Sequence, residues 1–293
     1  MSVRTRDSLT HSTLIDSVSS VDLRVRDIDR AIGFYSDVVG LRVHDRARTS
    51  ASLGTSADVI LRLDSTGVEA PADPRATGLF HNAFLFPDRG SLGDALVRLA
   101  AAGYQVAAGD HLVSEALYID DPDGNGVELC RDRPEAEWPA PTADMIVPMA
   151  TLPVDLQAVL EAGRGRDAEG DEAPPETHVG HVHLQVADIG DTTRFYADVL
   201  GLDLMATLAG SAAFLSSNGY HHHVGANTWR SRHGRPSLRT KAGLERITFR
   251  VNNEDDLPTL AAKLHSRGHH MDQEEGAVSL KDPDGIDLVF SPA

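Results

Sequence analysis

Residues 115–128 read Glu-Ala-Leu-Tyr-Ile-Asp-Asp-Pro-Asp-Gly-Asn-Gly-Val-Glu, a pattern that predicts a strand, a tight turn and a second strand. Pro122 presets the backbone of the turn, and Gly124 can adopt the positive φ that a turn of this kind needs. In the second strand Glu128 alternates with apolar neighbours, so it faces the opposite side from them. A carboxylate that faces inward must be paired or bound to a metal, whereas one on a solvated face needs no partner. This stretch alone leaves both interpretations open.

Outside this stretch, the chain repeats itself. Asp121-Pro-Asp-Gly124 recurs as Asp282-Pro-Asp-Gly285, and Val18-Ser-Ser-Val-Asp-Leu-Arg-Val25 corresponds to Val179-Gly-His-Val-His-Leu-Gln-Val186. The pairs Phe34-Tyr35 and Phe195-Tyr196 keep the same offset. A constant offset along the whole chain indicates a tandem duplication.

Each half divides again into two units with one order of elements, a strand, a helix and three short strands. The predicted helices span about residues 28–39, 91–102, 189–200 and 254–266, and glycines follow or end several of them. The fold class is therefore α+β, built from four βαβββ modules. We expect a flexible arm at 1–15, a first domain of two modules at 16–134, a linker at 135–176 and a second domain of two modules at 177–293. Within the linker, 154–161 has a short helical pattern and 163–175 is typical of a flexible segment.

Composition narrows the classes of function. The formal net charge of the 293 residues is −17 and no basic cluster occurs, which argues against a nucleic-acid partner. No apolar run is long enough to cross a membrane, and the N-terminus lacks the apolar core of a secretory signal. A single cysteine fits a reducing cytoplasm, and fourteen histidines suggest that any metal is held by imidazole and carboxylate.

Four such modules, with the opening pattern His-x-x-Leu-x-Val-x-Asp, then Phe-Tyr, then Gly-Leu, resemble the vicinal oxygen chelate superfamily. That superfamily includes glyoxalase I, the fosfomycin and bleomycin resistance proteins and the type I extradiol dioxygenases. The resemblance covers nearly the whole chain outside the linker. It implies that paired modules form two half-open eight-stranded barrels, and that ligands to one divalent metal come from the first and last strands of modules.

The closer resemblance is to ring-cleaving dioxygenases of the catechol 2,3-dioxygenase type. The run from Tyr118 to Glu128 is similar to their closing motif, which implies an active-site acid at Tyr118 and a metal ligand at Glu128. It further implies a ligand at His81 and an acid or base that binds substrate at His111. The run Gly219-Tyr-His-His-His-Val-Gly-Ala-Asn-Thr-Trp229 is similar to the strand whose histidine handles dioxygen and protons, which makes His222 or His223 the candidate.

One departure from that pattern concerns how the modules pair. The first module has Ser20 where the family has its first histidine, and the repeat partner of Ser20 is His181. The repeat partners of His81, Tyr118 and Glu128 are Arg246, Ser279 and Val289, so neither half holds a full ligand set. We therefore expect the second module to pair with the third and the first with the fourth, which gathers the metal ligands His81, Glu128 and His181 in one barrel. A separation of more than about 6 Å between Glu128 and His181 would refute this pairing, because bonds to a shared ion are near 2 Å.

Several choices stay open at this stage. His183 shares the face of His181, because residues two apart in a strand point the same way. Among residues 221–223, either His222 alone or the outer pair points into the barrel, with His222 slightly favoured. His269 and His270 are expected to be solvated.

The function implied by the resemblance is extradiol cleavage of a catechol-type substrate by O2 at a non-haem Fe(II) centre, with Mn(II) as the alternative metal. His111 and Tyr118 would bind the substrate oxygens, and the product would be of the muconic semialdehyde type. A glyoxalase-like metal-dependent isomerase or lyase is the second candidate, and a metal-free binding or resistance protein is the third. The expected partners are small molecules, and the sequence is compatible with a homo-oligomer without fixing the oligomeric state.

Overall fold

A computed structural model describes residues 14–163, 172–274 and 276–292. The predicted N-terminal arm therefore lies outside the described residues except for residues 14 and 15, and so does most of the predicted flexible segment at 163–175.

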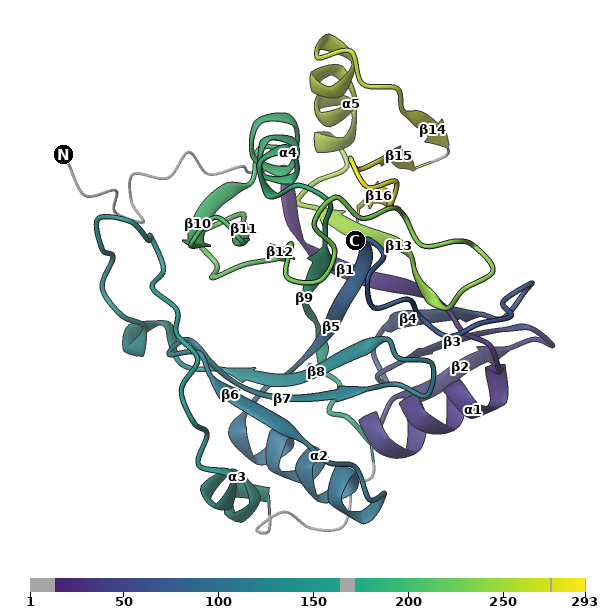
Figure 1. Ribbon diagram of the computed structural model, residues 1–293, viewed down its shortest axis with the longest axis vertical. Coiled ribbons are helices and arrows are strands. Elements are labelled where there is room, and N and C mark those ends of the chain that lie inside the picture. The colour runs from purple at the N-terminus through teal and green to yellow at the C-terminus, as the bar shows by residue number, and fades with distance from the viewer. Residues whose placement is uncertain (1–13, 164–171, 275, 293) are drawn as a thin grey trace.

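Two eight-stranded sheets organise the molecule (Figure 1). The first sheet has the strand order β14-β15-β16-β13-β1-β4-β3-β2, and the second has the order β10-β11-β12-β9-β5-β8-β7-β6. Each sheet thus joins strands from both halves of the chain, the first module with the fourth and the second with the third. This arrangement confirms the interleaved pairing and the predicted α+β fold of βαβββ modules.

The strands of the first sheet are β1 (Ile15–Arg24), β2 (Arg42–Arg46), β3 (Ser50–Gly54), β4 (Val59–Asp64), β13 (Gly243–Val251), β14 (Asp272–Glu274), β15 (Ala277–Lys281) and β16 (Asp287–Ser291). Those of the second sheet are β5 (Gly78–Phe86), β6 (Ala107–Asp110), β7 (Ser114–Asp120), β8 (Gly126–Asp132), β9 (His178–Gln185), β10 (Asp203–Leu208), β11 (Ala212–Ser216) and β12 (Val224–Asn227). In both sheets the two modules meet through antiparallel opening strands, β1 with β13 and β5 with β9.

The helices lie where the sequence predicts them, with one refinement. The predicted helix at 28–39 is a short α-helix, α1 (Ile28–Gly33), that continues as a π-helix, η2 (Phe34–Val39), and its counterpart is α4 (Ile189–Arg194) with η4 (Phe195–Leu200). The carboxylate of Asp27 caps α1, and Gly40 follows η2 with φ 95°, a conformation that favours glycine. The remaining helical segments are α2 (Arg89–Ala101), η3 (Glu135–Glu137), α3 (Leu156–Gly163) and α5 (Asp256–Ser266).

Hydrogen bonds between modules that follow each other in the sequence complete the assembly. The hydroxyl of Tyr35 in η2 donates to Asp121 (3.1 Å) in the turn between β7 and β8. The repeat makes the same bond, from Tyr196 in η4 to Asp282 (3.2 Å) in the turn between β15 and β16. Hence the sheets connect modules one with four and two with three, while these Tyr–Asp bonds connect one with two and three with four.

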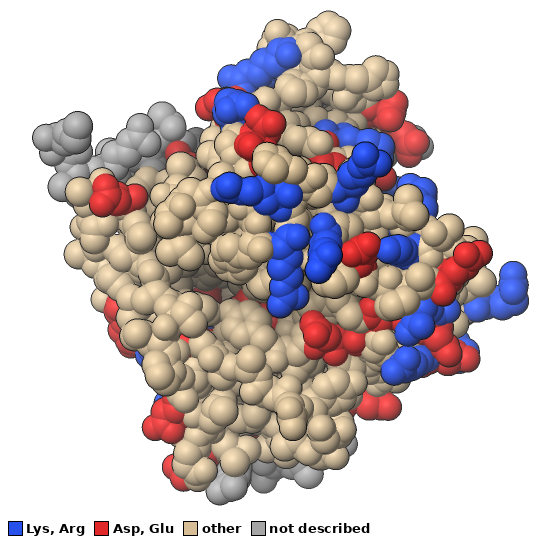
Figure 2. Space-filling model, viewed as in Figure 1, with Lys and Arg blue, Asp and Glu red and all other residues tan. Residues whose placement is uncertain are grey.

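Alternation along the strands separates an apolar face from a polar one. In β8, Val127 and Leu129 belong to the main hydrophobic core, together with buried residues of both sheets. Glu128 points to the other, concave face of the second sheet, and it is 2% exposed. Figure 2 shows the molecule hollowed between the strands β10–β12 and β6–β8. Among the described residues, no helix is long and apolar enough to cross a membrane.

Candidate metal centre

Three strands of the second sheet bring the predicted ligands together. His81 lies in β5, Glu128 in the adjacent parallel strand β8, and His181 in the adjacent antiparallel strand β9. Because β5 lies between the other two strands, side chains from both halves of the chain meet on one concave face. All three residues are buried, with 6%, 2% and 2% of their surfaces exposed.

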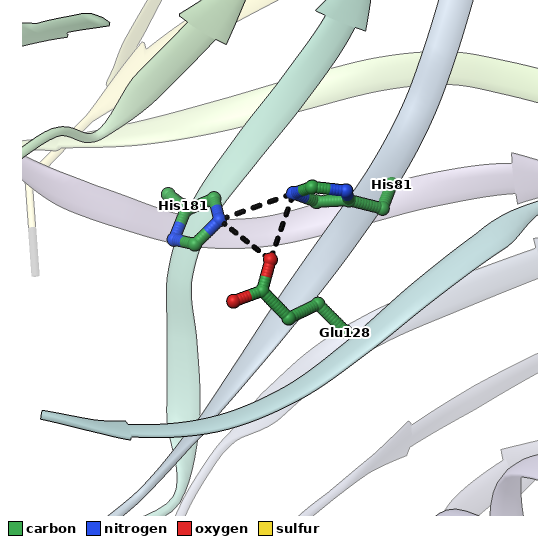
Figure 3. A group of neighbouring side chains, drawn as sticks. All are labelled: His81, Glu128 and His181. Carbon is green, nitrogen blue, oxygen red and sulfur yellow. Dashed lines mark hydrogen bonds and ion pairs between the residues drawn. The ribbon is translucent and has the colours of Figure 1, made fainter. Parts of the chain in front are cut away.

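The donor atoms converge on one point (Figure 3). His81 Nε2 lies 2.9 Å from Glu128 Oε2, His181 Nε2 lies 3.2 Å from the same oxygen, and the two Nε2 atoms are 3.2 Å apart. Glu128 and His181 are thus much closer than the separation of about 6 Å that would have refuted the interleaved pairing. Neighbouring ligands on an octahedral ion with bonds of about 2.1 Å lie about 3 Å apart. The three atoms therefore match one triangular face of such an ion and leave the opposite face open.

The charge of Glu128 has no permanently cationic partner among the described residues. Burial raises its pKa, but the imidazoles of His181 and His81 outweigh burial and hold the pKa well below its ordinary value. Glu115, in the neighbouring strand β7, is equally buried yet pairs with Arg89 (2.8 Å) and Arg131 (2.5 Å). Leaving a buried carboxylate uncompensated costs on the order of several kcal/mol. A divalent cation bound between Glu128 and the two imidazoles would offset that cost with a permanent positive charge.

Tyr118 and His111 form a hydrogen-bonded pair beside His81. Tyr118 faces Glu128 across the β7–β8 ladder, and its ring lies 5.5 Å from that of His81. The Nδ1 of His111 lies 2.8 Å from the carbonyl oxygen of Ala150, which can only accept, so this nitrogen carries the proton. His111 Nε2 therefore accepts from the Tyr118 hydroxyl at 2.6 Å. Burial and the charge of Glu128 raise the pKa of Tyr118 well above its ordinary value, which keeps the phenol protonated.

The histidine run at 221–223 does not lie in a strand, contrary to the sequence prediction. These residues form a bend before β12, which begins at Val224, so strand alternation does not apply to them. The ring of His222 lines the cavity, with its centre 4.1 Å from that of His181. His223 turns away to Ser216 and Ser217, and burial lowers its pKa to about 3.

His221 and Asp132 complete this corner of the site. The sequence offered His221 only as a member of the outer pair of the histidine run, and it gave no role to Asp132. His221 Nε2 lies 3.0 Å from Asp132 Oδ1, and its Nδ1 lies 2.8 Å from His222 Nδ1. Burial lowers the pKa of His221, which favours the neutral ring. Asn218 and Gly219, both with positive φ, are the turn-forming signal that could have shown that the run is a loop.

His183 is buried in the cavity wall, neither solvated nor part of the donor cluster. It lies opposite His81 in the β5–β9 ladder, with ring centres 4.9 Å apart. Its Nε2 has no hydrogen-bond partner among the described residues. Gly225 makes room for the ring, because a Cβ at that position would lie 2.9 Å from it. Burial lowers the pKa of His183 well below its ordinary value.

The cavity above the donor cluster has a volume of about 870 Å³. Aromatic side chains form much of one wall, with Phe80 5.3 Å from Trp229 and His183 5.8 Å from Phe214 between ring centres. Part of the predicted linker closes another wall, through Met145, Met149, Ala150 and Thr151. The backbone N–H of Ile146 holds this segment by donating to Met205 in β10 (2.8 Å). A cavity of this size suits a small aromatic molecule.

The first sheet offers no comparable donor set among the described residues. In place of the histidine, Ser20 accepts a hydrogen bond from Arg62 (2.8 Å). Arg246, the counterpart of His81, lies 3.6 Å from Asp22. The cluster of His81, Glu128 and His181 is the metal-compatible group found among the described residues.

Comparisons with known proteins agree with this architecture. Residues 15–129 and 178–290 match the model of the Glyoxalase/Bleomycin resistance protein/Dioxygenase superfamily. The catechol-2,3-dioxygenase of Bacillus subtilis (strain 168) is 38% identical over 265 residues, which cover 89% of this chain and 92% of that protein.

Solved structures show the same fold at low sequence identity. A putative dioxygenase from Bacillus subtilis superposes with a TM-score of 0.66 at 14% identity, over 96% of this chain and 86% of that one. Glyoxalase I from Zea mays superposes with a TM-score of 0.55 at 17% identity, over 94% and 92% of the two chains.

The chain therefore belongs to the glyoxalase/bleomycin resistance protein/dioxygenase superfamily. Its similarity over nearly its full length groups it, within that superfamily, with the catechol-2,3-dioxygenase-like oxidoreductases.

Proposed function

We propose that this protein is an extradiol dioxygenase that opens catechol-type rings with O2 at a non-haem Fe(II) ion held by His81, Glu128 and His181. The observation that carries the proposal is the donor set itself. Two imidazoles and one carboxylate, spaced as one face of an octahedron, are the ligand type that ferrous oxygenases use, because the open face admits both substrates. Mn(II) would fit the same donors, since carboxylate and imidazole accept both metals.

The bound metal would supply the electron transfer that lets dioxygen react with an electron-rich diol. The chain supplies the rest. Tyr118 keeps its proton, which it donates to His111, and it sits beside Glu128, so its hydroxyl oxygen can accept a hydrogen bond from a diol O–H next to the donor cluster. His111 accepts from Tyr118 and orients it. His222 lies on the other side, against His181, where it can exchange a proton with a ligand in the cavity.

The surrounding cavity fits the proposed substrate class. The rings of Phe80, Phe214 and Trp229 provide apolar surface for an aromatic ring, and the segment with Met145 and Met149 covers it from the other side. Such a lining excludes bulk water from the reacting groups and leaves hydrogen bonding to a few side chains. The relationship to the catechol-2,3-dioxygenase of Bacillus subtilis supports the choice of catechols.

Anaerobic loading with Fe(II), followed by addition of a series of catechols in air-saturated buffer, tests the proposal. We expect one O2 consumed per catechol and a coloured ring-cleavage product whose absorbance rises with O2 uptake. The same protein loaded with Zn(II) should consume no O2. Failure of the Fe(II) protein to consume O2 with any catechol, combined with turnover of a non-aromatic substrate by the Zn(II) or Ni(II) form, would instead indicate a glyoxalase-like enzyme.

A further inference from the structure

A chain of three side chains runs from the edge of the molecule to the cavity. It begins at Asp132, at the end of β8, whose side chain is 21% exposed. Asp132 Oδ1 contacts His221 Nε2 at 3.0 Å, and His221 Nδ1 contacts His222 Nδ1 at 2.8 Å. His222 ends the chain in the cavity wall. Asp132 comes from the second module and the two histidines from the third, so the chain of contacts exists only in the interleaved pairing.

The order of donors and acceptors follows from the first link. A carboxylate can only accept, so His221 Nε2 must carry the proton that it shares with Asp132. A neutral imidazole has one N–H, which leaves His221 Nδ1 as an acceptor. The short contact between the two Nδ1 atoms then requires His222 to donate from its Nδ1. The remaining nitrogen of His222, Nε2, is left without a proton, and it makes no hydrogen bond with the described residues.

Other contacts stabilise the hydrogen bond between Asp132 and His221. Tyr220 donates its hydroxyl to Asp132 Oδ2 (2.8 Å), which fixes the rotation of the carboxylate. The ring of Tyr220 also packs on that of His221, with centres 4.0 Å apart, and Trp138 contacts His221 from another side at 5.4 Å. His221 itself is 1% exposed, so water does not compete for its two hydrogen bonds.

We propose that Asp132 and His221 are positioning residues that fix His222 as the Nδ1–H tautomer, so that it presents a hydrogen-bond acceptor at Nε2 to the ligand in the cavity. This inference rests on the proposed function for its catalytic meaning. His222 would take the proton of a diol hydroxyl as it binds, and would not act as the first donor to dioxygen. Neither His221 nor Asp132 touches the ligand in this scheme.

Nitrogen-15 NMR of the full-length protein, labelled at histidine and loaded with diamagnetic Zn(II), tests this directly. Long-range proton–nitrogen spectra distinguish a protonated ring nitrogen from an unprotonated one, and the signals missing in a His222→Gln sample identify His222. We expect Nδ1 protonated and Nε2 unprotonated in the wild type. A protonated Nε2 on neutral His222 overturns the proposal, whether or not the protein is a dioxygenase.

The variant Asp132→Asn provides a second test of the proposal. The amide can donate to His221 Nε2, which would move the proton of His221 to Nδ1 and reverse His222, placing N–H at its Nε2. We expect that reversal in the spectrum and, in the Fe(II) enzyme, a fall in kcat/KM for catechol of about 10²-fold or more with iron content little changed. Asp132→Glu, which keeps the carboxylate, should restore the wild-type tautomer. An unchanged His222 tautomer in Asp132→Asn contradicts the positioning role; should that variant not fold, the wild-type spectrum still decides.

Discussion

At the scale of single residues, two chemically similar carboxylates in adjacent strands have different surroundings. Glu115 is neutralised by arginines, which are charged at every accessible pH, whereas Glu128 has only two imidazoles. The arginine cluster accounts for Glu115 as a structural ion pair. A bound divalent cation would account equally well for Glu128, and the spacing of the three donor atoms defines where we propose that it binds.

Loss of one imidazole should therefore release the metal. We expect His181→Gln to lower the affinity for Fe(II) by more than about 100-fold, since even the loss of a supporting contact around a bound metal costs 10–100-fold. His178→Gln is the matched control, because His178 lies in the same strand but is exposed. Iron per chain after anaerobic loading and desalting measures both. Equal iron content in the two variants would contradict the assignment of His181.

Tyr118→Phe should separate catalysis from metal binding. The variant keeps the ring against His81 but removes the hydroxyl that donates to His111. We expect kcat with catechol to fall by about 10² to 10⁴-fold, the range that a positioned acid or base contributes. Iron content should remain that of the wild type. A variant with wild-type kcat would exclude Tyr118 from proton transfer.

The sequence was sufficient to predict which residues would form the donor cluster, because the closing motif and the missing histidine at Ser20 each constrain the pairing. It was not sufficient for Asp132 and His221. Their roles depend on a loop from one module meeting a strand end of another, and no spacing in the sequence encodes that contact. The cavity wall around Met145 was missed because a proline-rich composition resembles a linker, although Met145-Ile-Val-Pro-Met149 is an apolar run that such a linker seldom contains.

At the scale of elements, the two Asp-Pro-Asp-Gly turns have the same structure, although only one of them lies in the sheet that carries the donor cluster. In both, the first aspartate accepts backbone N–H groups of its own turn and a tyrosine hydroxyl from a π-helical segment. The predicted helix ends and turn glycines were found as expected, because capping and positive φ depend on local sequence. The π-helical continuation of α1 and α4 has no comparable local signal.

The turn at Asp282 predicts a pH dependence of stability. Burial raises the pKa of Asp282 to about 7 from its ordinary 3.8. The folded chain thus holds this proton more tightly than the unfolded chain, and the stabilisation is complete at low pH and lost as the pH rises through about 7. Asp282→Asn removes this titration. We expect the variant's deficit in free energy of unfolding, measured by urea denaturation, to shrink between about pH 5 and about pH 8. A deficit that grows over this interval would contradict the assignment.

At the scale of the whole molecule, the interleaved sheets make the site a joint product of the two halves of the chain. His81 and Glu128 belong to the first half and His181 to the second, and β5 and β9 form the seam between them. A duplicated chain that paired within each half would have given two incomplete donor sets. The Tyr–Asp bonds between successive modules tie the two sheets together without changing this pairing.

Separate halves should therefore fail to bind the metal, and their combination should succeed. We expect fragments 1–163 and 172–293, produced singly, to retain little iron after desalting, because neither carries all three ligands. Refolded together, they should recover iron binding and O2 uptake with catechol. The intact chain, refolded in the same way, is the control. Full iron binding by the N-terminal fragment alone would contradict the interleaved site.

The most direct measurement of the central claim is the anomalous scattering of iron in crystals of the Fe(II)-loaded protein grown without oxygen. We predict a single strong peak per chain, within bonding distance of His81 Nε2, Glu128 Oε2 and His181 Nε2, with its open side toward Tyr118 and His222. A peak elsewhere, such as at the inner face of the first sheet near Ser20 and Asp22, or no peak in a crystal of active protein, would contradict the claim.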